Sequence, residues 1–476
     1  MARSLHRLGL PGAPSERHPA TIRNITQQAF IPNLSDGDEK AYPFFRQKAV
    51  FERADVGLKH VSCSGALVIS TTGSGTSQRA ASTYDPPFSP YDYSIVITRT
   101  TLAFAVDNNP VLRVFLKHTF YAQFCAGENP AEVGQTIANL KSIGFTGVIL
   151  GYAKEVVLSD AQTKDLASCG EGKTAEECIR IEINPWAHGT METVKLAQPG
   201  DFVALKFTGA GRQALYTLSE RLPPSEALTN AIDAICSFAA VRGVRLLFDA
   251  EQTTLQPGID DWTIDYMRKY NKQPGKAVIY GTYQAYLKST PQTLQRHLDV
   301  ARDEGFTLGV KLVRGAYIGS DPRHLIHDTK SDTDAAYDGI AESLLRKQWG
   351  DVLKGDSQMP PVSLVLASHN AESVRMARAI CDAGEAKIDI AFAQLQGMAD
   401  EVSCELVLKK SDGNDTKAQA VEAYKYLVWG STGECMKYLL RRAHENRDAV
   451  QRTRSGRDAM WSELVRRIRG VIGISL

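Results

Sequence analysis

The sequence lacks the cysteine patterns of a disulfide framework or of a structural zinc site. Its eight cysteines are scattered along the chain, and no two of them form a C-x-x-C pair. Small disulfide-stapled domains and zinc-binding modules use closely and regularly spaced cysteines, so both classes are disfavoured. Dispersed cysteines are typical of proteins that work in a reducing compartment.

A long apolar run and a strong net charge are also missing. A membrane-spanning helix needs about 18 or more apolar residues, and the best candidate, residues 94–106, is interrupted by Arg99. Lys and Arg number 55 against 54 Asp and Glu, which gives a net charge of +1. The chain therefore has no overall basic field that would attract nucleic acid, and we expect no nucleic-acid partner.

Two nucleotide-binding motifs are incomplete or missing. The segment Thr72-Gly73-Ser74-Gly75-Thr76 resembles a phosphate loop but is not followed by Lys and Ser or Thr. It lies in a stretch rich in Gly, Ser, Thr and Pro, residues 71–94, which we interpret as a flexible linker. No G-x-G-x-x-G follows the first predicted strand, so a Rossmann-type start is not supported.

The N-terminus has the composition of a mitochondrial targeting segment. Arg3, Arg7, Arg17 and Arg23 lie in it, and Glu16 is the only acid before Asp36. We expect residues 1–40 to be a leader, residues 41–116 an N-terminal arm that contains the linker, and residues 117–450 the catalytic domain.

Beyond Phe120, apolar runs alternate with amphipathic stretches, which predicts strands alternating with helices in a parallel sheet. Eight repeats favour a closed (β/α)8 barrel of the TIM type over an open doubly wound sheet. The predicted strands are residues 147–152, 202–207, 244–249, 277–283, 307–313, 362–368, 388–394 and 420–426. The predicted helices include residues 226–241, 291–304, 334–348 and 372–382. Residues 153–200 and 314–333 are then long loops that follow strands, where function is often located.

Polar residues stand at or just after the end of every predicted strand. Function in such barrels collects at the C-terminal strand ends, so these residues indicate a shared pocket. They are Glu155, Lys206, Asp249, Glu251, Gln284, Lys311, Arg314, His369, Asn370, Gln394 and Tyr426. The lysines and arginine among them suggest that the pocket binds anions. A weaker possibility is a metal site at His324, His327 and Asp328, but a surface turn explains that spacing better.

Two adjacent arginines, Arg441 and Arg442, follow apolar Tyr438, Leu439 and Leu440 in a helix-like run. The apolar residues indicate a partly buried helix, and a half-buried arginine pair needs an anion. Two guanidinium groups can grip one carboxylate or phosphate bidentately. We therefore predict that this pair binds an anionic substrate.

Several ordered motifs together resemble the proline dehydrogenase family. The resemblance spans roughly residues 117–450. It points to the eukaryotic mitochondrial, single-function type, and among these to the fungal one. We expect no aldehyde dehydrogenase domain of the kind present in many bacterial relatives, because the chain ends at Leu476. The motifs are Asp249-Ala250-Glu251, Thr282 to Tyr286, Lys311 to Tyr317, His327 to Lys330 with Thr333-Asp334, Ala367 to Asn370, Leu395 to Met398, Tyr424 to Tyr426, and Arg441 to Asn446.

The resemblance implies a distorted barrel that binds FAD without a covalent bond. It implies oxidation of L-proline to pyrroline-5-carboxylate, with electrons passed to ubiquinone at the matrix side of the inner mitochondrial membrane. For the substrate it implies Arg441, Arg442 and Lys206 on the carboxylate, Glu155 paired with Arg441 at the gate, and Asp249, Tyr426 and Leu395 as lining. For FAD it implies Gln284, Lys311, Val313, Gly315, Ala316, Thr329, Lys330, His369 and Asn370.

Three alternatives remain open at this point. One is a metal-dependent barrel hydrolase or aldolase, and another is a barrel that binds a ligand without catalysis. The third is a hydroxyproline-oxidising relative, although such relatives carry Ser where this chain has Tyr426. Residues 451–476 complete the layout as an expected amphipathic C-terminal helix, with Trp461, Leu464 and Ile468 at helical spacing and several arginines elsewhere. Such a helix suits a peripheral position on an anionic membrane surface, and a helix docked on the barrel explains the pattern at least as well.

The arginine pair gives a first prediction. Replacing Arg442 with Met removes a charged hydrogen-bond partner of the carboxylate, which costs roughly 1.5–3 kcal/mol, or about tenfold to a hundredfold in affinity. We expect the KM for proline to rise by this factor while the FAD content stays near that of the wild type. A variant that lost FAD and still bound proline normally would contradict this role.

Overall fold

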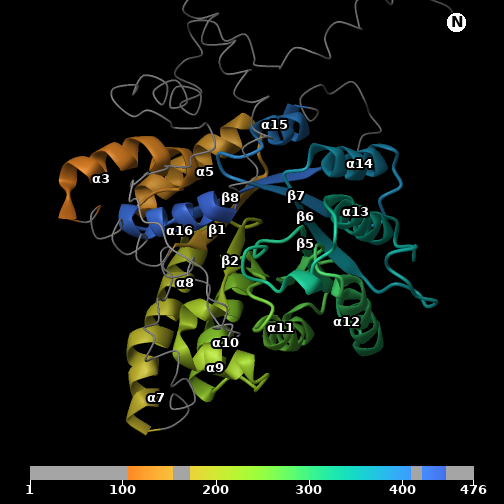
Figure 1. The fold of residues 1–476 in the computed structure, drawn as a ribbon, viewed down its shortest axis with the longest axis horizontal. Helices are drawn as coiled ribbons and strands as arrows, with labels where there is room; N and C mark the ends of the chain where they lie inside the picture. Colours follow the sequence, from red (N-terminus) through yellow and green to blue (C-terminus); the bar gives the residue numbers. More distant parts are fainter. Residues whose placement is uncertain (1–105, 107, 154–171, 409–420, 446–476) are drawn as a thin grey trace, which may run out of the picture. The chain divides into compact units, whose positions relative to one another are not determined.

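Eight strands of the chain form one closed, parallel barrel (Figure 1). The computed structural model describes residues 106, 108–153, 172–408 and 421–445. Each strand pairs with its neighbour in sequence, and β8 pairs with β1 to close the ring. The strands are β1 Gly147–Tyr152, β2 Phe202–Leu205, β3 Arg245–Phe248, β4 Ile279–Gln284, β5 Leu308–Val313, β6 Val362–Ala367, β7 Ile390–Leu395 and β8 Glu422–Trp429. The predicted TIM-like barrel is confirmed.

Helices follow the strands and cover the outside of the barrel, as Figure 1 shows for α10 to α14. Before β1 lie α3 Pro110–Leu116, the π-helix η3 Lys117–Tyr121, α4 Ala122–Phe124 and α5 Pro130–Ile143. Between β1 and β3 lie α7 Gly172–Cys178, the π-helix η5 Ile179–Ile183, α8 Asn184–Leu196, the 3-10 turn η6 Phe207–Ala210, α9 Arg212–Ser219 and α10 Glu226–Val241. The later ones are α11 Gln256–Tyr270, α12 Thr290–Glu304, η7 Arg323–Leu325, α13 Lys330–Arg346, α14 Ala371–Asp382, α15 Asp400–Leu408 and α16 Thr432–Glu445. No helix among the described residues is both long and apolar enough to span a membrane.

Polar residues at the helix starts explain where several helices begin. Asn129 caps α5, accepting a hydrogen bond from the Glu132 N–H at 3.0 Å, and Pro130 follows it at the first helical position. Thr329 and Asp332 form a reciprocal capping box at the start of α13. The capping box starts α13 at Lys330, four residues before the start that apolar spacing predicts.

The N-terminal end of the barrel interior is closed by aromatic side chains. Phe202 packs edge-on against Tyr280 and Tyr424, with ring centroids 5.5 and 5.0 Å apart. The Arg245 guanidinium lies 3.7 Å from the centroid of the Phe202 ring, and its Nη2 donates to the Tyr424 hydroxyl at 2.6 Å. These side chains fill the interior at the N-terminal strand ends, which leaves the C-terminal strand ends as the expected place for a ligand.

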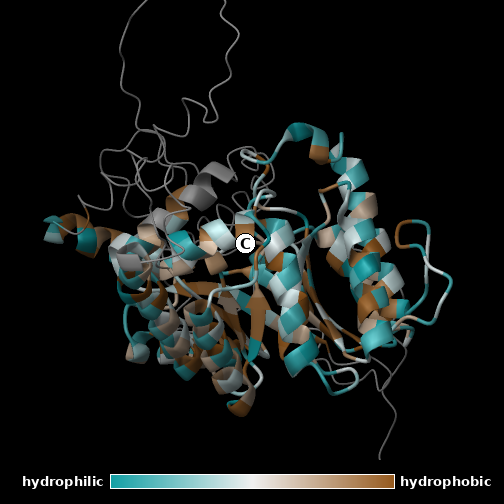
Figure 2. Cartoon of the chain, turned by 90° about the horizontal axis from the view of Figure 1, so that it is seen from below, coloured by the Kyte–Doolittle hydropathy of each residue, from teal (hydrophilic) through white to brown (hydrophobic). Residues whose placement is uncertain are grey.

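A second apolar layer lies between the strands and the surrounding helices. It is the larger part of the core and includes fully buried Val148, Leu246, Val310 and Phe392 on outward faces of the strands. Figure 2 shows the resulting pattern, with hydrophobic colour on the strands and on the inner sides of the helices. Burial on both faces is typical of parallel barrels and explains the near-continuous apolar strand sequences.

Most predicted strand boundaries were wrong by one or two residues, and three differences bear on the site. The second strand ends at Leu205, because Lys206 leaves the sheet as the N-cap residue of η6. The eighth strand continues to Trp429, so Tyr426 lies inside β8, level with Leu395 at the end of β7. The predicted loop of residues 153–200 contains η5 and α8. The leader, most of the N-terminal arm, Glu155 and the C-terminal residues 446–476 lie outside the described residues.

Candidate active site

A buried ion pair lies at the C-terminal mouth of the barrel. Lys311 Nζ, from β5, lies 2.6 Å from Asp249 Oδ1, the residue that follows β3. Tyr426 reaches across from β8 and donates its hydroxyl to the other Asp249 oxygen at 3.1 Å. The tyrosine ring lies close to Gly151 of β1, where a Cβ would stand 3.0 Å from the phenol oxygen. Four strands thus contribute to one compact cluster.

The Asp249 carboxylate is stabilised in its charged form. Burial alone would raise its pKa, but the positive charges of Lys311 and Lys206 and the hydrogen bonds from Lys311 and Tyr426 outweigh burial and lower the pKa below its ordinary value. Asp249 is 7% exposed and Lys311 6% exposed. The pair is therefore shielded from water, and each charge depends on the other.

Glu251 forms a second buried acidic group beside the first. Its Oε1 accepts the Thr208 N–H at 3.1 Å, and its other oxygen accepts the Thr208 hydroxyl in a short hydrogen bond. Burial raises its pKa, Asp249 adds to this effect, and Lys206 and Thr208 oppose it. Lys206 therefore lies within electrostatic range of both acids. The motif Asp249-Ala250-Glu251 identifies Glu251, but no feature of the sequence identifies Thr208 as its hydrogen-bond partner.

The predicted cofactor residues of β4 and β5 are brought together. Gln284 is buried, its Oε1 accepts the Ala316 N–H at 3.1 Å, and its Nε2 donates to the Glu251 carbonyl at 3.4 Å. Val313 is half-buried at the end of β5. Gly315 has a φ of +154°, and a Cβ there would lie 2.4 Å from the Tyr286 ring, so the turn after β5 requires glycine.

The remaining predicted residues lie at helix starts next to the strand ends. His369 follows β6, and its Nε2 accepts the Leu395 N–H of β7 at 3.0 Å. Asn370 caps α14 through the N–H groups of Glu372 and Ser373. Thr329 and Lys330 are exposed at the start of α13, and Lys330 pairs with Asp334. These residues surround the β5 to β7 side of the mouth rather than its centre.

Arg441 and Arg442 lie in the last turns of α16, the helix that follows β8. Tyr438, one turn earlier, is buried in an apolar cluster with Cys435, Val428 and Tyr121, which docks the helix beside the barrel. The prediction of a partly buried helix is therefore confirmed for the preceding turn. The side chains of both arginines, like all of Glu155, lie outside what the structure describes.

The alternative metal residues do not gather. His324 is exposed in η7, and the Asp328 carboxylate accepts hydrogen bonds from Lys288 at 3.2 Å. In the part of the chain that the structure describes, no three His, Cys, Asp or Glu side chains are grouped as a metal ion would require.

The polar residues of the mouth fit a large cofactor that carries hydrogen-bonding edges. Gln396 follows β7, is 6% exposed, and its Oε1 has no hydrogen-bond partner among the described residues. A buried unpaired acceptor is costly and is explained when a bound group supplies a donor. Buried Gln284 and Lys311 stand on nearby strands, and the strand ends of β4 to β7 supply polar atoms around the same opening. These hydrogen-bonding and charged groups are compatible with a bound flavin.

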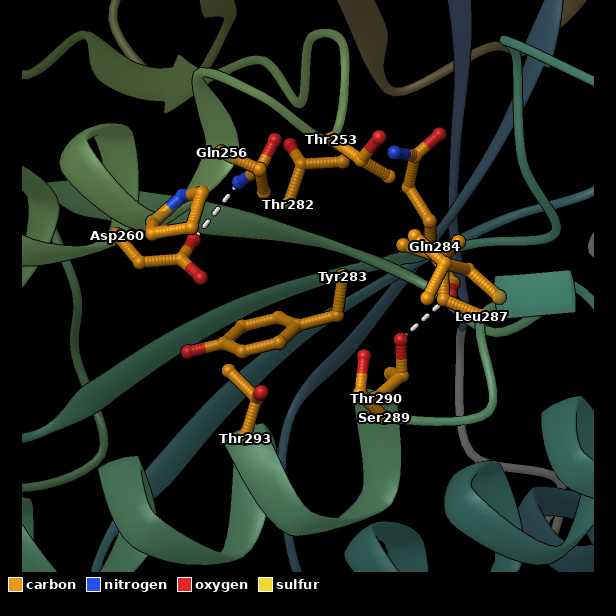
Figure 3. Close-up of a pocket in the computed structure, with 12 residues that line it drawn as sticks. Thr253, Gln256, Asp260, Thr282, Tyr283, Gln284, Leu287, Ser289, Thr290 and Thr293 are labelled. Atoms are coloured by element: carbon orange, nitrogen blue, oxygen red, sulfur yellow. Dashed lines mark hydrogen bonds between the residues drawn. The ribbon is translucent and has the colours of Figure 1, made fainter. Parts of the chain in front are cut away.

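A separate cavity of about 170 Å³ lies between the starts of α11 and α12 (Figure 3). It contacts the mouth only at the end of β4, where Thr282 and Gln284 form part of its wall. Gln256 donates to Asp260 at 2.7 Å across one side. Asp260 is a half-buried acid in these surroundings, and burial raises its pKa to about 7, with Gln256 and the charges of Arg296 and Arg221 opposing and Asp261 assisting.

The fold and mouth define a barrel enzyme with a buried cation–carboxylate cluster, and comparisons with known proteins give its family. A family model described as proline dehydrogenase matches residues 133–455. The probable mitochondrial proline dehydrogenase of Schizosaccharomyces pombe is 31% identical over 405 residues, which cover 74% of this chain and 80% of that protein. The chain therefore belongs to the proline dehydrogenase family, a family of enzymes.

Other relatives differ in length or in name. Mitochondrial proline dehydrogenase 1 of Caenorhabditis elegans is 36% identical over 299 residues, which cover 60% of this chain but only 46% of that protein. Hydroxyproline dehydrogenase of Bos taurus is 28% identical, covering 75% of this chain and 82% of that protein. A structure of proline utilization A from Bdellovibrio bacteriovorus has a TM-score of 0.54 at 17% identity, covering 76% of this chain and 36% of that one, and shares the fold.

Asp260 gives a pH-dependent prediction. Its folded-state pKa of about 7 lies above the ordinary value of 3.8, so the folded protein keeps a proton that the unfolded chain loses. Stability should therefore fall as the pH rises from about 4 to 7 and level off above that range. Asp260→Asn stays neutral throughout, so it should gain stability over the wild type in this window, by about 1–3 kcal/mol at pH 8, given about 1.4 kcal/mol per pKa unit and partial solvent contact.

Thermal unfolding midpoints between pH 4.5 and 8 measure this difference. Asp265→Asn is the matched control, because Asp265 is an exposed acid five residues further along α11 that pairs with Arg268. Its thermal unfolding midpoint should not rise relative to that of the wild type as the pH increases. A constant difference between Asp260→Asn and wild type would contradict the raised pKa.

Proposed function

We propose that this protein catalyses the FAD-dependent oxidation of L-proline to pyrroline-5-carboxylate. The observation that carries the proposal is the buried Asp249–Lys311–Tyr426 cluster at the mouth of a barrel whose residues match the proline dehydrogenase family. The reaction removes a hydride from proline Cδ and a proton from the ring nitrogen, and forms the C=N bond. The enzyme must therefore hold an anionic amino acid and keep its nitrogen deprotonated.

The FAD would be held by residues around the β4 to β6 side of the mouth. They are Gln284, Lys311, Val313, Gly315, Ala316, Thr329, Lys330, His369 and Asn370. When bound, FAD accepts the hydride from proline. Lys311 brings a fixed positive charge to this side, and Asp249 keeps its ammonium group oriented through the 2.6 Å ion pair. Gln396, just after β7, supports a bound group with a hydrogen-bond donor next to this side, because its Oε1 has no partner among the described residues.

The substrate carboxylate would be held by Arg441, Arg442 and Lys206. Charge-assisted bonds from three cations fix the ring in one orientation, which places Cδ toward the flavin. Tyr426 and Leu395, paired across β8 and β7, would line the ring, and Asp249 would position Tyr426. Glu155 would pair with Arg441 and close the pocket.

The same cations would favour the deprotonated nitrogen. A positive surrounding disfavours the ammonium form of bound proline, which lowers the pKa of its amine. Hydride loss from Cδ needs the nitrogen lone pair, so this shift increases the reactive fraction at neutral pH. Arg441, Arg442 and Lys206 would thus serve substrate binding and activation together.

The electron acceptor would be ubiquinone, and the protein would lie peripherally on the matrix side of the inner mitochondrial membrane. Support comes from the names of the S. pombe and C. elegans relatives, which are mitochondrial, and from the arginine-rich N-terminus. The basic amphipathic segment 456–476 would supply the membrane contact. Deleting it should reduce pelleting with cardiolipin liposomes and leave dye-linked activity intact; unchanged pelleting would remove this segment from the proposal.

The absorbance spectrum of the purified protein tests the function. It should show flavin bands that bleach on addition of proline and recover when a short-chain ubiquinone is added. A colourless protein, or a flavin that proline leaves oxidised, would contradict the proposal. A colourless protein with stoichiometric zinc would instead favour a metal-dependent hydrolase.

Tyr426 predicts which substrate is preferred. Its hydroxyl lies next to Gly151 and donates to Asp249, and its ring would occupy the space that a hydroxyl on the proline ring would need. Burying an unpaired hydroxyl costs roughly 1–3 kcal/mol, so the wild type should prefer proline over 4-hydroxyproline. Tyr426→Ser should lower kcat/KM for proline and narrow the ratio between the two substrates.

Tyr426→Phe is the matched control, because it loses the hydrogen bond to Asp249 and keeps the ring. It should lower activity without changing the substrate ratio. The ratio of kcat/KM values is measured in flavin-loaded protein. If Tyr426→Ser folds, binds flavin and keeps the wild-type ratio, Tyr426 does not set the substrate, and the hydroxyproline alternative stays open.

A further inference from the structure

Glu251 is buried at the barrel mouth, and the proposed substrate and cofactor contacts leave it without a role. It follows Asp249 by two residues and is 4% exposed. Its backbone N–H donates to Gln256 at 2.9 Å, and its carbonyl accepts Gln284 Nε2. The residue is therefore held in place from both sides, and its side chain points to a single partner, Thr208.

Thr208 gives Glu251 two hydrogen bonds. Its backbone N–H and its hydroxyl each donate to a different carboxylate oxygen, the first at 3.1 Å. Bidentate contacts of this kind fix both the distance and the orientation of the segment that donates them. The segment is η6, a 3-10 turn, and it begins directly after Lys206.

Lys206 is the residue that this turn positions. It is the N-cap residue of η6, with φ of −116° and ψ of 124°, and its side chain makes no capping hydrogen bond. Its carbonyl accepts the Trp186 Nε1–H at 3.0 Å. The backbone of Lys206 is thus fixed between Trp186 on one side and the Glu251-bound turn on the other.

We propose that Glu251 is a positioning residue, whose carboxylate holds the turn Phe207–Ala210 through Thr208 and so fixes Lys206 at the substrate carboxylate. This inference rests on the proposed role of Lys206 in proline binding. Glu251 does not contact substrate in this assignment; it acts through the backbone that carries the lysine. Thr208 and Glu251 are 43 positions apart in the sequence, and their contact joins two separate strand ends, β2 and β3.

The alternative is that Glu251 acts through its charge. Lys206 lies within electrostatic range of both Glu251 and Asp249, so removing one acid also changes the potential at the lysine. Glu251→Gln separates the two explanations. The amide oxygen can still accept the Thr208 N–H, and the amide nitrogen can donate to the Thr208 hydroxyl, so the turn is kept and the charge is lost.

The experiment measures binding of tetrahydrofuran-2-carboxylate, the ring-oxygen analogue of proline, by its effect on the flavin spectrum of the holoenzyme. We expect Glu251→Ala and Thr208→Val each to weaken binding by about tenfold, because a misplaced lysine forfeits most of a charged hydrogen bond. Glu251→Gln should stay within about threefold of the wild type. With proline as substrate, the two weakened variants should raise KM more than they lower kcat.

A double-mutant cycle with Lys206→Met gives the decisive result. If Glu251 acts through Lys206, Glu251→Ala and Thr208→Val should produce no further weakening in the Lys206→Met protein. Thr263→Val is the control, since Thr263 is more deeply buried than half-buried Thr208 and donates its hydroxyl to the Ile259 carbonyl, 2.6 Å away within α11. It should lower the thermal midpoint and leave the affinity unchanged.

Each outcome decides between the proposals. Equal weakening in the wild-type and Lys206→Met backgrounds, or a loss in Glu251→Gln as large as in Glu251→Ala, would overturn the positioning role alone. A wild-type flavin that proline does not bleach, or a Lys206→Met protein with unchanged affinity, would instead overturn the proposed function or its Lys206 contact. If Glu251→Ala fails to retain flavin, the double-mutant cycle is measured with Thr208→Val and Lys206→Met alone.

Discussion

The ion pair between Asp249 and Lys311 is the interaction on which the barrel mouth depends. Transferring two charges from water into a protein interior costs several kcal/mol for each ion, and only close pairing with further hydrogen bonds offsets that cost. Asp249 meets this requirement by accepting hydrogen bonds from both Lys311 and Tyr426. The pair in turn orients the tyrosine, whose hydroxyl would lie 3.0 Å from a Cβ at Gly151, so β1 has a glycine at this level.

Strand positions were predictable because a parallel barrel buries both faces of its strands. The resulting apolar runs are short and uninterrupted, and the predicted first strand agrees with β1 at both ends. The predicted eighth strand ends too early, because Tyr426 has the polar hydroxyl expected of a strand end, although Leu427 and Val428 continue the buried run. Helix α8 was missed because η5 and Pro185 interrupt the regular apolar spacing before it.

The individual site residues were predictable from the sequence, but the contacts between their side chains were not. Motifs identified Asp249, Lys311 and Tyr426, and the position of each near a strand end suggested one pocket. Which side chain meets which depends on strand register and on turns such as η6, and a single sequence does not specify either. The Thr208–Glu251 contact shows this limit, because a threonine two residues beyond a strand carries no signal of its own.

The hydrogen bond between Tyr426 and Asp249 joins residues 177 positions apart, across the seam where β8 closes on β1. No contiguous fragment that lacks β8 can contain the assembled mouth, and joining such distant segments carries a large loop-closure entropy and slows folding. A cofactor that binds the closed ring and not the open chain would then act as a folding ligand, stabilising the barrel in proportion to its concentration. The supply of flavin during biosynthesis would thereby control how much of this protein accumulates, before any question of catalytic rate arises.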